Sequence, residues 1–67
     1  MSDVLKVIEL LSESEESWED AASQAVARAN RSLNGIKSVY IKNFEGKVEN
    51  GKITTYRVNA QVSFALE

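Results

Sequence analysis

The dipeptide Asn50-Gly51 constrains the fold of this chain more than any other feature. Asn-Gly between stretches of alternating apolar and polar residues is the strongest short-range signal for a two-residue hairpin turn, because both turn residues adopt positive φ. The flanking stretches, Ile36–Glu49 and Lys52–Leu66, alternate with period two over most of their length. The sequence therefore predicts a long antiparallel hairpin in which Glu49 lies opposite Lys52.

This register sorts the hairpin into two sheet faces. One face is mostly apolar and is expected to receive a helix. Its members are Val39, Ile41, Asn43, Tyr56, Val58, Ala60, Val62, Phe64 and Leu66. The other face sets Ser38, Tyr40, Lys42 and Phe44 opposite Ser63, Gln61, Asn59 and Arg57. Gly46 is expected to mark a bulge that shifts the register by one residue. Aromatic rings among polar groups suit a face that meets another copy or a ligand.

The segment before the hairpin predicts a strand and a helix. Val4–Leu11 is almost wholly apolar, which indicates a strand covered on both faces. A run of serines and glutamates favours a helix start near Ser14. An apolar stripe with helical spacing follows, made of Trp18, Ala21, Ala22, Ala25, Val26, Ala29 and Leu33. Asn34-Gly35 is expected to end the helix.

The predicted fold class is therefore α+β, with the order β-α-β-β. A three-stranded antiparallel sheet curved around one amphipathic helix is the simplest architecture with this order. Without a linker, repeat or low-complexity segment, residues 1–67 are expected to form a single domain.

Length and composition limit the chemistry of such a domain. A chain of 67 residues buries a modest share of its surface, so it needs a further source of stability. It contains no cysteine and no histidine, which removes disulfides and Cys/His zinc sites and leaves oligomerisation. The same absences remove thiolate nucleophiles, Ser-His pairs and imidazole bases, so we expect a protein that is not an enzyme.

Charge and hydropathy favour a soluble cytoplasmic protein. The formal net charge of -2 and the pI near 5.1 give no electrostatic reason to expect nucleic acid or an anionic membrane as a partner. No apolar run is long enough to cross a bilayer, and Met1-Ser2-Asp3 lacks the basic start of a signal peptide.

Five motifs, in this order and over almost the whole chain, resemble the dodecin family. They are Val7-Ile8-Glu9-Leu10, Ser14-x-x-Ser17-Trp18-Glu19-x-Ala21, Glu49-Asn50-Gly51-Lys52, Tyr56-x-Val58 and Val62-Ser63-Phe64-x-Leu66-Glu67. The resemblance implies a hollow homododecamer of cubic symmetry with the helices outside the curved sheets. It also implies that flavin (riboflavin, FMN or lumichrome) binds in pairs at two-fold interfaces and is stored rather than turned over.

The sequence departs from the family pattern where the ligand would bind. The ring-stacking tryptophan at the start of the second strand is replaced by Ser38, and the glutamine directly after Tyr56 is replaced by Arg57. Two positions that are often basic in bacterial members, and could meet phosphate, are Glu45 and Ala65 here. A ring stack and a hydrogen bond each contribute about 0.5–1.5 kcal/mol, so we expect weaker or altered flavin binding.

A rearranged site for a planar ligand would use residues of the same sheet face, since Arg57 can stack its guanidinium on a ring. The predicted ligand-binding residues are Ser38, Tyr40, Arg57, Gln61 and Glu45, with no catalytic and no metal-binding residue. Most of them have a structural interpretation as well. Ser38 could let two subunits approach closely, Arg57 could pair with Glu45, and Gln61 could face a water-filled lumen.

The alternative function is a flavin-free structural shell that binds a different small ligand or an ion such as calcium. The carboxylates that could gather such a cation are Glu13, Glu15, Glu16, Glu19 and Asp20. A solvated helix N-terminus is the favoured interpretation of these side chains. Trp18 is expected to pack in the core. A bound chromophore would distinguish the flavin store from the shell.

Overall fold

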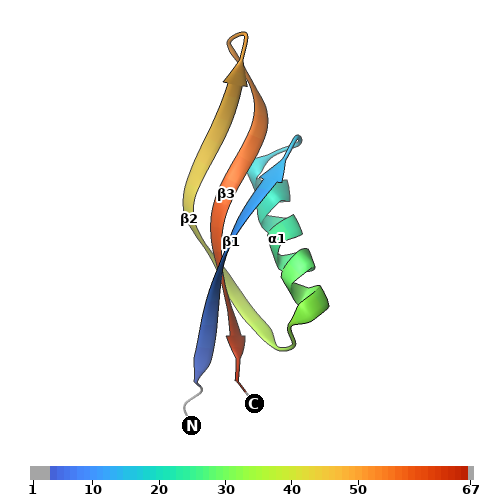
Figure 1. Ribbon diagram of the computed structural model, residues 1–67, viewed down its shortest axis with the longest axis vertical. Coiled ribbons are helices and arrows are strands. Elements are labelled where there is room, and N and C mark those ends of the chain that lie inside the picture. Colours follow the sequence, from blue (N-terminus) through green and yellow to red (C-terminus); the bar gives the residue numbers. More distant parts are fainter. Residues whose placement is uncertain (1–3, 67) are drawn as a thin grey trace.

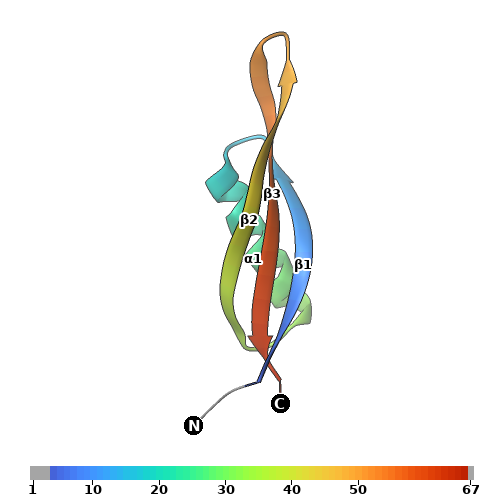
Figure 2. The same cartoon turned by 90° about the vertical axis from the view of Figure 1, so that its left-hand side faces the viewer.

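A computed structural model describes residues 4–66 as one three-stranded sheet with one helix (Figure 1). The elements are β1 (Leu5–Ser14), α1 (Trp18–Ser32), β2 (Ile36–Glu49) and β3 (Lys52–Ala65). The strands pair antiparallel in the order β1-β3-β2, and α1 lies against one side of the sheet (Figure 2). The predicted α+β class and the β-α-β-β order are confirmed. Met1-Ser2-Asp3 and Glu67 lie outside the described residues.

The β2–β3 hairpin has the predicted turn. Asn50 and Gly51 have φ values of 53° and 76°, as a turn with two left-handed residues requires. Glu49 lies opposite Lys52, and Ile41 lies opposite Ala60, as expected. Beyond the end of β1 the hairpin continues as a two-stranded arm (Figure 1).

The β2–β3 ladder is interrupted at three places, where Lys37, Lys42 and Thr54 have no partner across it. The irregularity at Thr54 lies close to the bulge expected at Gly46. The one at Lys42 was not predicted, and it restores the original register towards the start of β2. Between Lys42 and Thr54 every pair is therefore displaced by one residue from the predicted ladder.

This displacement makes part of the predicted face assignment wrong. Phe44 was expected opposite Arg57 on the helix-free face, but it lies opposite Val58, and Glu45 lies opposite Arg57 instead. A one-residue shift moves a side chain to the other face of a sheet. Phe44 thus meets Trp18 of α1 edge-on, with ring centroids 6.2 Å apart. The expected pairs Asn43–Val58 and Lys42–Asn59 are likewise replaced, because Asn43 lies opposite Asn59.

The helix begins later than predicted. Its N-cap is Ser17, whose hydroxyl accepts a hydrogen bond from the backbone N–H of Asp20 at 2.9 Å. Ser14, the expected start, instead ends β1, and its buried hydroxyl donates to Asp20 Oδ2 at 2.6 Å. The cap at Leu33 is extended, so the left-handed Gly35, with φ of 72°, shapes the turn into β2 rather than the helix end itself.

The core is thin and built from small side chains. Its buried apolar members are Ala21, Ala25, Ala29, Val58, Ala60 and Val62. The predicted alanine stripe thus faces the sheet, and Trp18 packs at the edge of the core as expected. Within the part of the chain that the structure describes, no helix is long and apolar enough to span a bilayer.

The side of the sheet away from α1 is here called the open face. It carries Val7, Glu9, Leu11 and Glu13 of β1, Ser38, Tyr40, Asn43 and Glu45 of β2, and Arg57, Asn59, Gln61 and Ser63 of β3. Asn43 was predicted on the helix face, and the same one-residue shift places it here. Several of its apolar side chains are uncovered; Leu11 is 70% exposed and Tyr40 is 64% exposed. The expectation that β1 is covered on both faces is therefore not met within one chain.

Candidate ligand site on the open face

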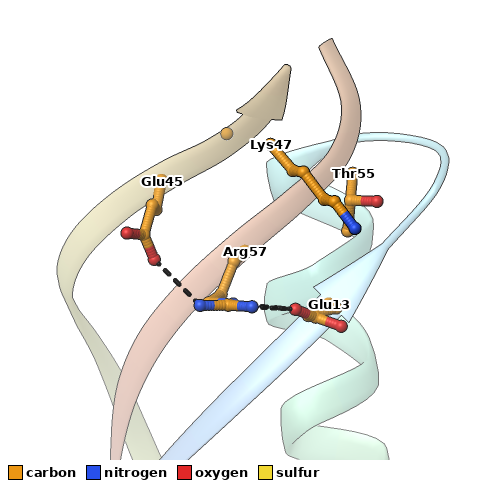
Figure 3. Close-up of a pocket in the computed structure, with 6 residues that line it drawn as sticks. Glu13, Glu45, Lys47, Thr55 and Arg57 are labelled. Carbon is orange, nitrogen blue, oxygen red and sulfur yellow. Dashed lines mark hydrogen bonds and ion pairs between the residues drawn. The ribbon is translucent and has the colours of Figure 1, made fainter. Parts of the chain in front are cut away.

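The open face contains a polar pocket of about 230 Å³ where β1 ends and the hairpin arm begins (Figure 3). Its lining residues are Glu13, Glu45, Gly46, Lys47, Thr55 and Arg57. All three strands contribute, because Glu13 and Glu45 lie opposite Arg57 in the two ladders that flank β3. The pocket therefore depends on the register of both ladders.

The guanidinium of Arg57 joins the two carboxylates across the sheet. Its Nε and Nη2 donate to Glu13 Oε2 at 2.8 and 2.5 Å, and its Nη1 donates to Glu45 Oε1 at 3.2 Å. Figure 3 shows the planar group lying between the two acidic side chains. We call this arrangement the Glu13–Arg57–Glu45 bridge.

The two carboxylates of the bridge stabilise the charged form of Arg57. Hydrogen bonding and charge from Glu13 raise the pKa of Arg57 above its ordinary value. Burial lowers the pKa by less than either of these, and Glu45 adds smaller increases through its charge and its hydrogen bond. The three side chains are half exposed to solvent, at 44%, 50% and 68% for Arg57, Glu13 and Glu45. Exposed ion pairs contribute little to stability, so the main effect of the bridge is to orient its three groups.

Trp18 holds β2 at the pocket. Its indole Nε1 donates to the backbone carbonyl of Glu45 at 2.9 Å. The indole ring also packs edge-on against Tyr56, with centroids 4.7 Å apart. The core contact predicted for Trp18 is thus confirmed, and the same side chain positions the backbone that carries the Glu45 carboxylate.

The five predicted site residues share the open face, but they fall into two groups. Arg57 and Glu45 line the pocket. Tyr40 lies opposite Gln61, and Ser38 lies opposite Ser63, further along the sheet. The hydroxyls of Ser38 and Ser63 share a hydrogen bond of 2.5 Å. The structural interpretation given to Arg57, an ion pair with Glu45, thus has a matching contact.

Asn59 lies between the two groups, opposite Asn43. Its Oδ1 atom is buried and has no hydrogen-bond partner within residues 4–66. A buried acceptor without a donor is costly, so Asn59 Oδ1 reduces the stability of the described chain.

Glu13 is the pocket residue that the sequence interpretation missed. It was grouped with the carboxylates of the helix N-terminus, but β1 extends to Ser14 and Glu13 is a strand residue. The period-two alternation of Val7, Glu9, Leu11 and Glu13 is the signal that could have placed it. Lys47 and Thr55 gave no comparable signal.

The acidic residues do not form a metal site within the described chain. Between residues 4 and 66, no three or more His, Cys, Asp or Glu side chains are grouped so as to hold a metal ion. Asp20 instead accepts hydrogen bonds from Ser14 and from Gln24, both at 2.6 Å.

The fold and the pocket define a class of small α+β protein, in which one sheet carries a helix on one side and an open polar and apolar face on the other. A family model for dodecins matches residues 4–67, and the chain belongs to the dodecin family.

Curated and structural relatives agree with this assignment. The calcium dodecin of Mycobacterium tuberculosis is 36% identical over 63 residues, which cover 94% of this chain and 89% of that protein. A crystal structure of a Thermus thermophilus dodecin variant is similar with a TM-score of 0.92 and 33% identity, covering 98% of both chains. The crystal structure of the M. tuberculosis protein, described as calcium chelating and as having a novel calcium-binding site, is similar with a TM-score of 0.81 and 40% identity, covering 96% of this chain and 91% of that one.

Proposed function

We propose that this protein is a cytoplasmic binding and storage protein, and not an enzyme, which holds flavin or a related planar ligand in a hollow homododecamer. Residues 1–67 would form its single dodecin-like domain. The observation that carries the proposal is the open face, where exposed Leu11 and Tyr40 lie on the same side of the sheet as a polar pocket. Such a surface is expected to be covered by other copies and by a ligand.

Arg57 and Glu45 supply groups that suit the polar edge of a flavin ring. Arginine has five N–H donors, and three of those on Arg57 bind carboxylates, which leaves two for a ring carbonyl. One carboxylate oxygen of Glu45 remains to accept a ring N–H. The pair thus offers a donor beside an acceptor, as a single glutamine amide would, and replaces the glutamine of the family pattern.

The remaining predicted residues would contact the body of the ring. Tyr40 offers the exposed aromatic face, while Ser38 and Gln61 offer small polar groups on the same side of the sheet. No tryptophan occupies position 38, so binding of riboflavin, FMN or lumichrome is expected to be weaker than with a full ring stack.

A second candidate function is a flavin-free shell that binds another small ligand or an ion such as calcium. The similarity to the M. tuberculosis calcium dodecin favours it. Calcium takes six to eight oxygen ligands. Because residues 4–66 of one chain hold no suitable acidic group, a calcium site would draw carboxylates from more than one copy.

Native mass spectrometry of the purified protein tests the proposal, since one spectrum gives both subunit number and bound mass. Twelve subunits that gain flavin mass when riboflavin is added support the store. Twelve subunits that gain only calcium, reversed by a chelator, support the second candidate. A monomer, or an assembly that binds no flavin, contradicts the proposed store.

Two arginine substitutions, one in the site and one outside it, test the role of Arg57. Arg57→Ala removes the bridge and is expected to lower riboflavin binding. Arg31→Ala removes the same charge from the exposed last turn of α1 and is expected to leave binding unchanged. Equal binding by Arg57→Ala and the unmodified protein would exclude Arg57 from the site.

A further inference from the structure

The charges of the pocket are already paired with one another. Its two cations are Arg57 and Lys47, and its two carboxylates are Glu13 and Glu45. Arg57 contacts both carboxylates, and Lys47 Nζ lies 3.7 Å from Glu49 Oε2. The local balance, with Glu49 included, is three negative charges against two positive ones. Each cation of the pocket thus already has a carboxylate partner, and the site carries no net positive charge to attract an anion.

A phosphate group would therefore find an unfavourable environment here. A phosphate monoester carries about -1.5 to -2 charges at neutral pH and needs free arginine or lysine donors. The two N–H groups that Arg57 has left belong to the guanidinium that contacts Glu13 and Glu45, so a phosphate bound to them would meet both carboxylates as like charges. Further along the open face, β3 ends in Ala65, which offers no charge at all.

We propose that the site selects uncharged planar ligands over their phosphorylated forms, and that Glu45 is the residue that sets this selectivity. The inference rests on the proposed function, because it concerns which ring ligand that site accepts. Glu45 is suited to the role since it contacts Arg57 through one bond at 3.2 Å, whereas Glu13 makes two shorter ones. Its side chain is also the most exposed of the bridge, at 68%.

Riboflavin and FMN provide the test, because they share one ring system and differ by the phosphate. Titration of the assembled protein by flavin fluorescence quenching is expected to give a riboflavin affinity roughly tenfold above that for FMN. Glu45→Gln keeps an acceptor for Arg57 Nη1 but removes the charge. It should bring the two affinities together, mainly by improving FMN binding.

Two controls separate this effect from general electrostatics and from altered folding. Glu19→Gln makes the same charge change on an exposed part of α1 and should leave the ratio of affinities unchanged. In about 1 M salt, where the screening length is about 3 Å, the preference of the unmodified protein for riboflavin should fall. Native mass spectra of each variant should show the same subunit number as the unmodified protein.

The outcomes are distinguishable. Riboflavin and FMN affinities that are equal in the unmodified protein, or a preference for FMN, overturn the inference and leave the proposed store intact. A preference that survives in Glu45→Gln overturns the assignment to Glu45. Binding of neither ligand overturns the proposed function together with the inference.

Discussion

Glu45 lies directly opposite Arg57 across the β2–β3 ladder and accepts a hydrogen bond from its Nη1 at 3.2 Å. This pair exists because the ladder is offset by one residue between the irregularities at Lys42 and Thr54. In a regular ladder Phe44 would lie opposite Arg57, and an exposed ring would replace a carboxylate at the pocket. The backbone register therefore places a carboxylate at the pocket. It also places Phe44 on the opposite face of the sheet, where its ring contacts Trp18.

Gly51 belongs to the turn that sets the register of the adjoining pairs, in which Glu49 lies opposite Lys52. Its φ of 76° is left-handed, so Gly51→Ala should destabilise the protein by about 1–2 kcal/mol. Asn50→Gly is the matched control, since φ of 53° at position 50 suits glycine as well and the change should be close to neutral. Urea denaturation at one fixed protein concentration measures both. Equal midpoints for Gly51→Ala and the unmodified protein would contradict the turn geometry.

The fold was predictable because three local signals agree with one another. Asn50-Gly51 predicts a tight turn, and the alternation on either side of it predicts two paired strands. The alanine stripe predicts an amphipathic helix that packs on their sheet, so all three signals favour the same fold. The helix start was less determined, since Ser12, Ser14 and Ser17 all offer a capping hydroxyl. Tertiary contacts decide between them, because Ser14 is used by Asp20 and by the backbone N–H of Glu16.

The site was predictable only in part. Period-two alternation correctly placed Arg57, Tyr40 and Gln61 on one face, since β3 pairs without interruption there. It misplaced Phe44, because a bulge at Lys42 has no signature such as glycine or proline in the sequence. Glu13 was missed because carboxylates before a helix and carboxylates at the end of a strand look alike in sequence.

The substitution Val58→Ala tests how much the thin core contributes to the stability of the protein. Val58 is fully buried at the centre of β3, so Val58→Ala should cost about 2 kcal/mol from lost burial and the cavity that remains. Val48→Ala makes the same change at a side chain that is 61% exposed and should have almost no effect. The difference between the two denaturation midpoints is the measurement. Similar midpoints would mean that the core collapses around the smaller residue.

Trp18 contacts both the core and the backbone of Glu45 at the pocket. Trp18→Phe removes the donor to the Glu45 carbonyl and part of the contact with Tyr56. We expect a loss of about 1–2 kcal/mol in stability. We also expect weaker riboflavin binding, because β2 is less firmly held at Glu45. Phe44→Leu, which trims the same aromatic cluster without a lost hydrogen bond, should lower stability but retain binding. Unchanged binding in Trp18→Phe would confine Trp18 to a packing role.

Alkaline pH should leave the Glu13–Arg57–Glu45 bridge intact. The two carboxylates raise the pKa of Arg57 above its ordinary value. A raised folded-state pKa contributes stability that is present below the unfolded value and lost only as pH rises through the folded one. The difference in unfolding midpoint between Arg57→Ala and the unmodified protein should therefore be the same at about pH 7 and about pH 10. A difference that shrinks at the higher pH would show that another group carries the contact.

Restoring the family's ligand groups offers the most direct test of how this site has changed. Ser38→Trp should supply a ring stack, and Arg57→Gln should supply one amide in place of the bridge. Ser38→Trp is expected to improve riboflavin affinity by roughly threefold to tenfold, from about 0.5–1.5 kcal/mol for the stack. Arg57→Gln should leave the affinity nearly unchanged, because the amide offers the same donor and acceptor as the bridge. The two positions belong to separate groups on the open face, so their effects in the double variant should add. Ser38→Leu controls for added apolar area without an aromatic ring. If Ser38→Trp binds riboflavin no better than Ser38→Leu, position 38 does not face the ligand, and the planar-ligand site would have to be confined to the pocket around Arg57.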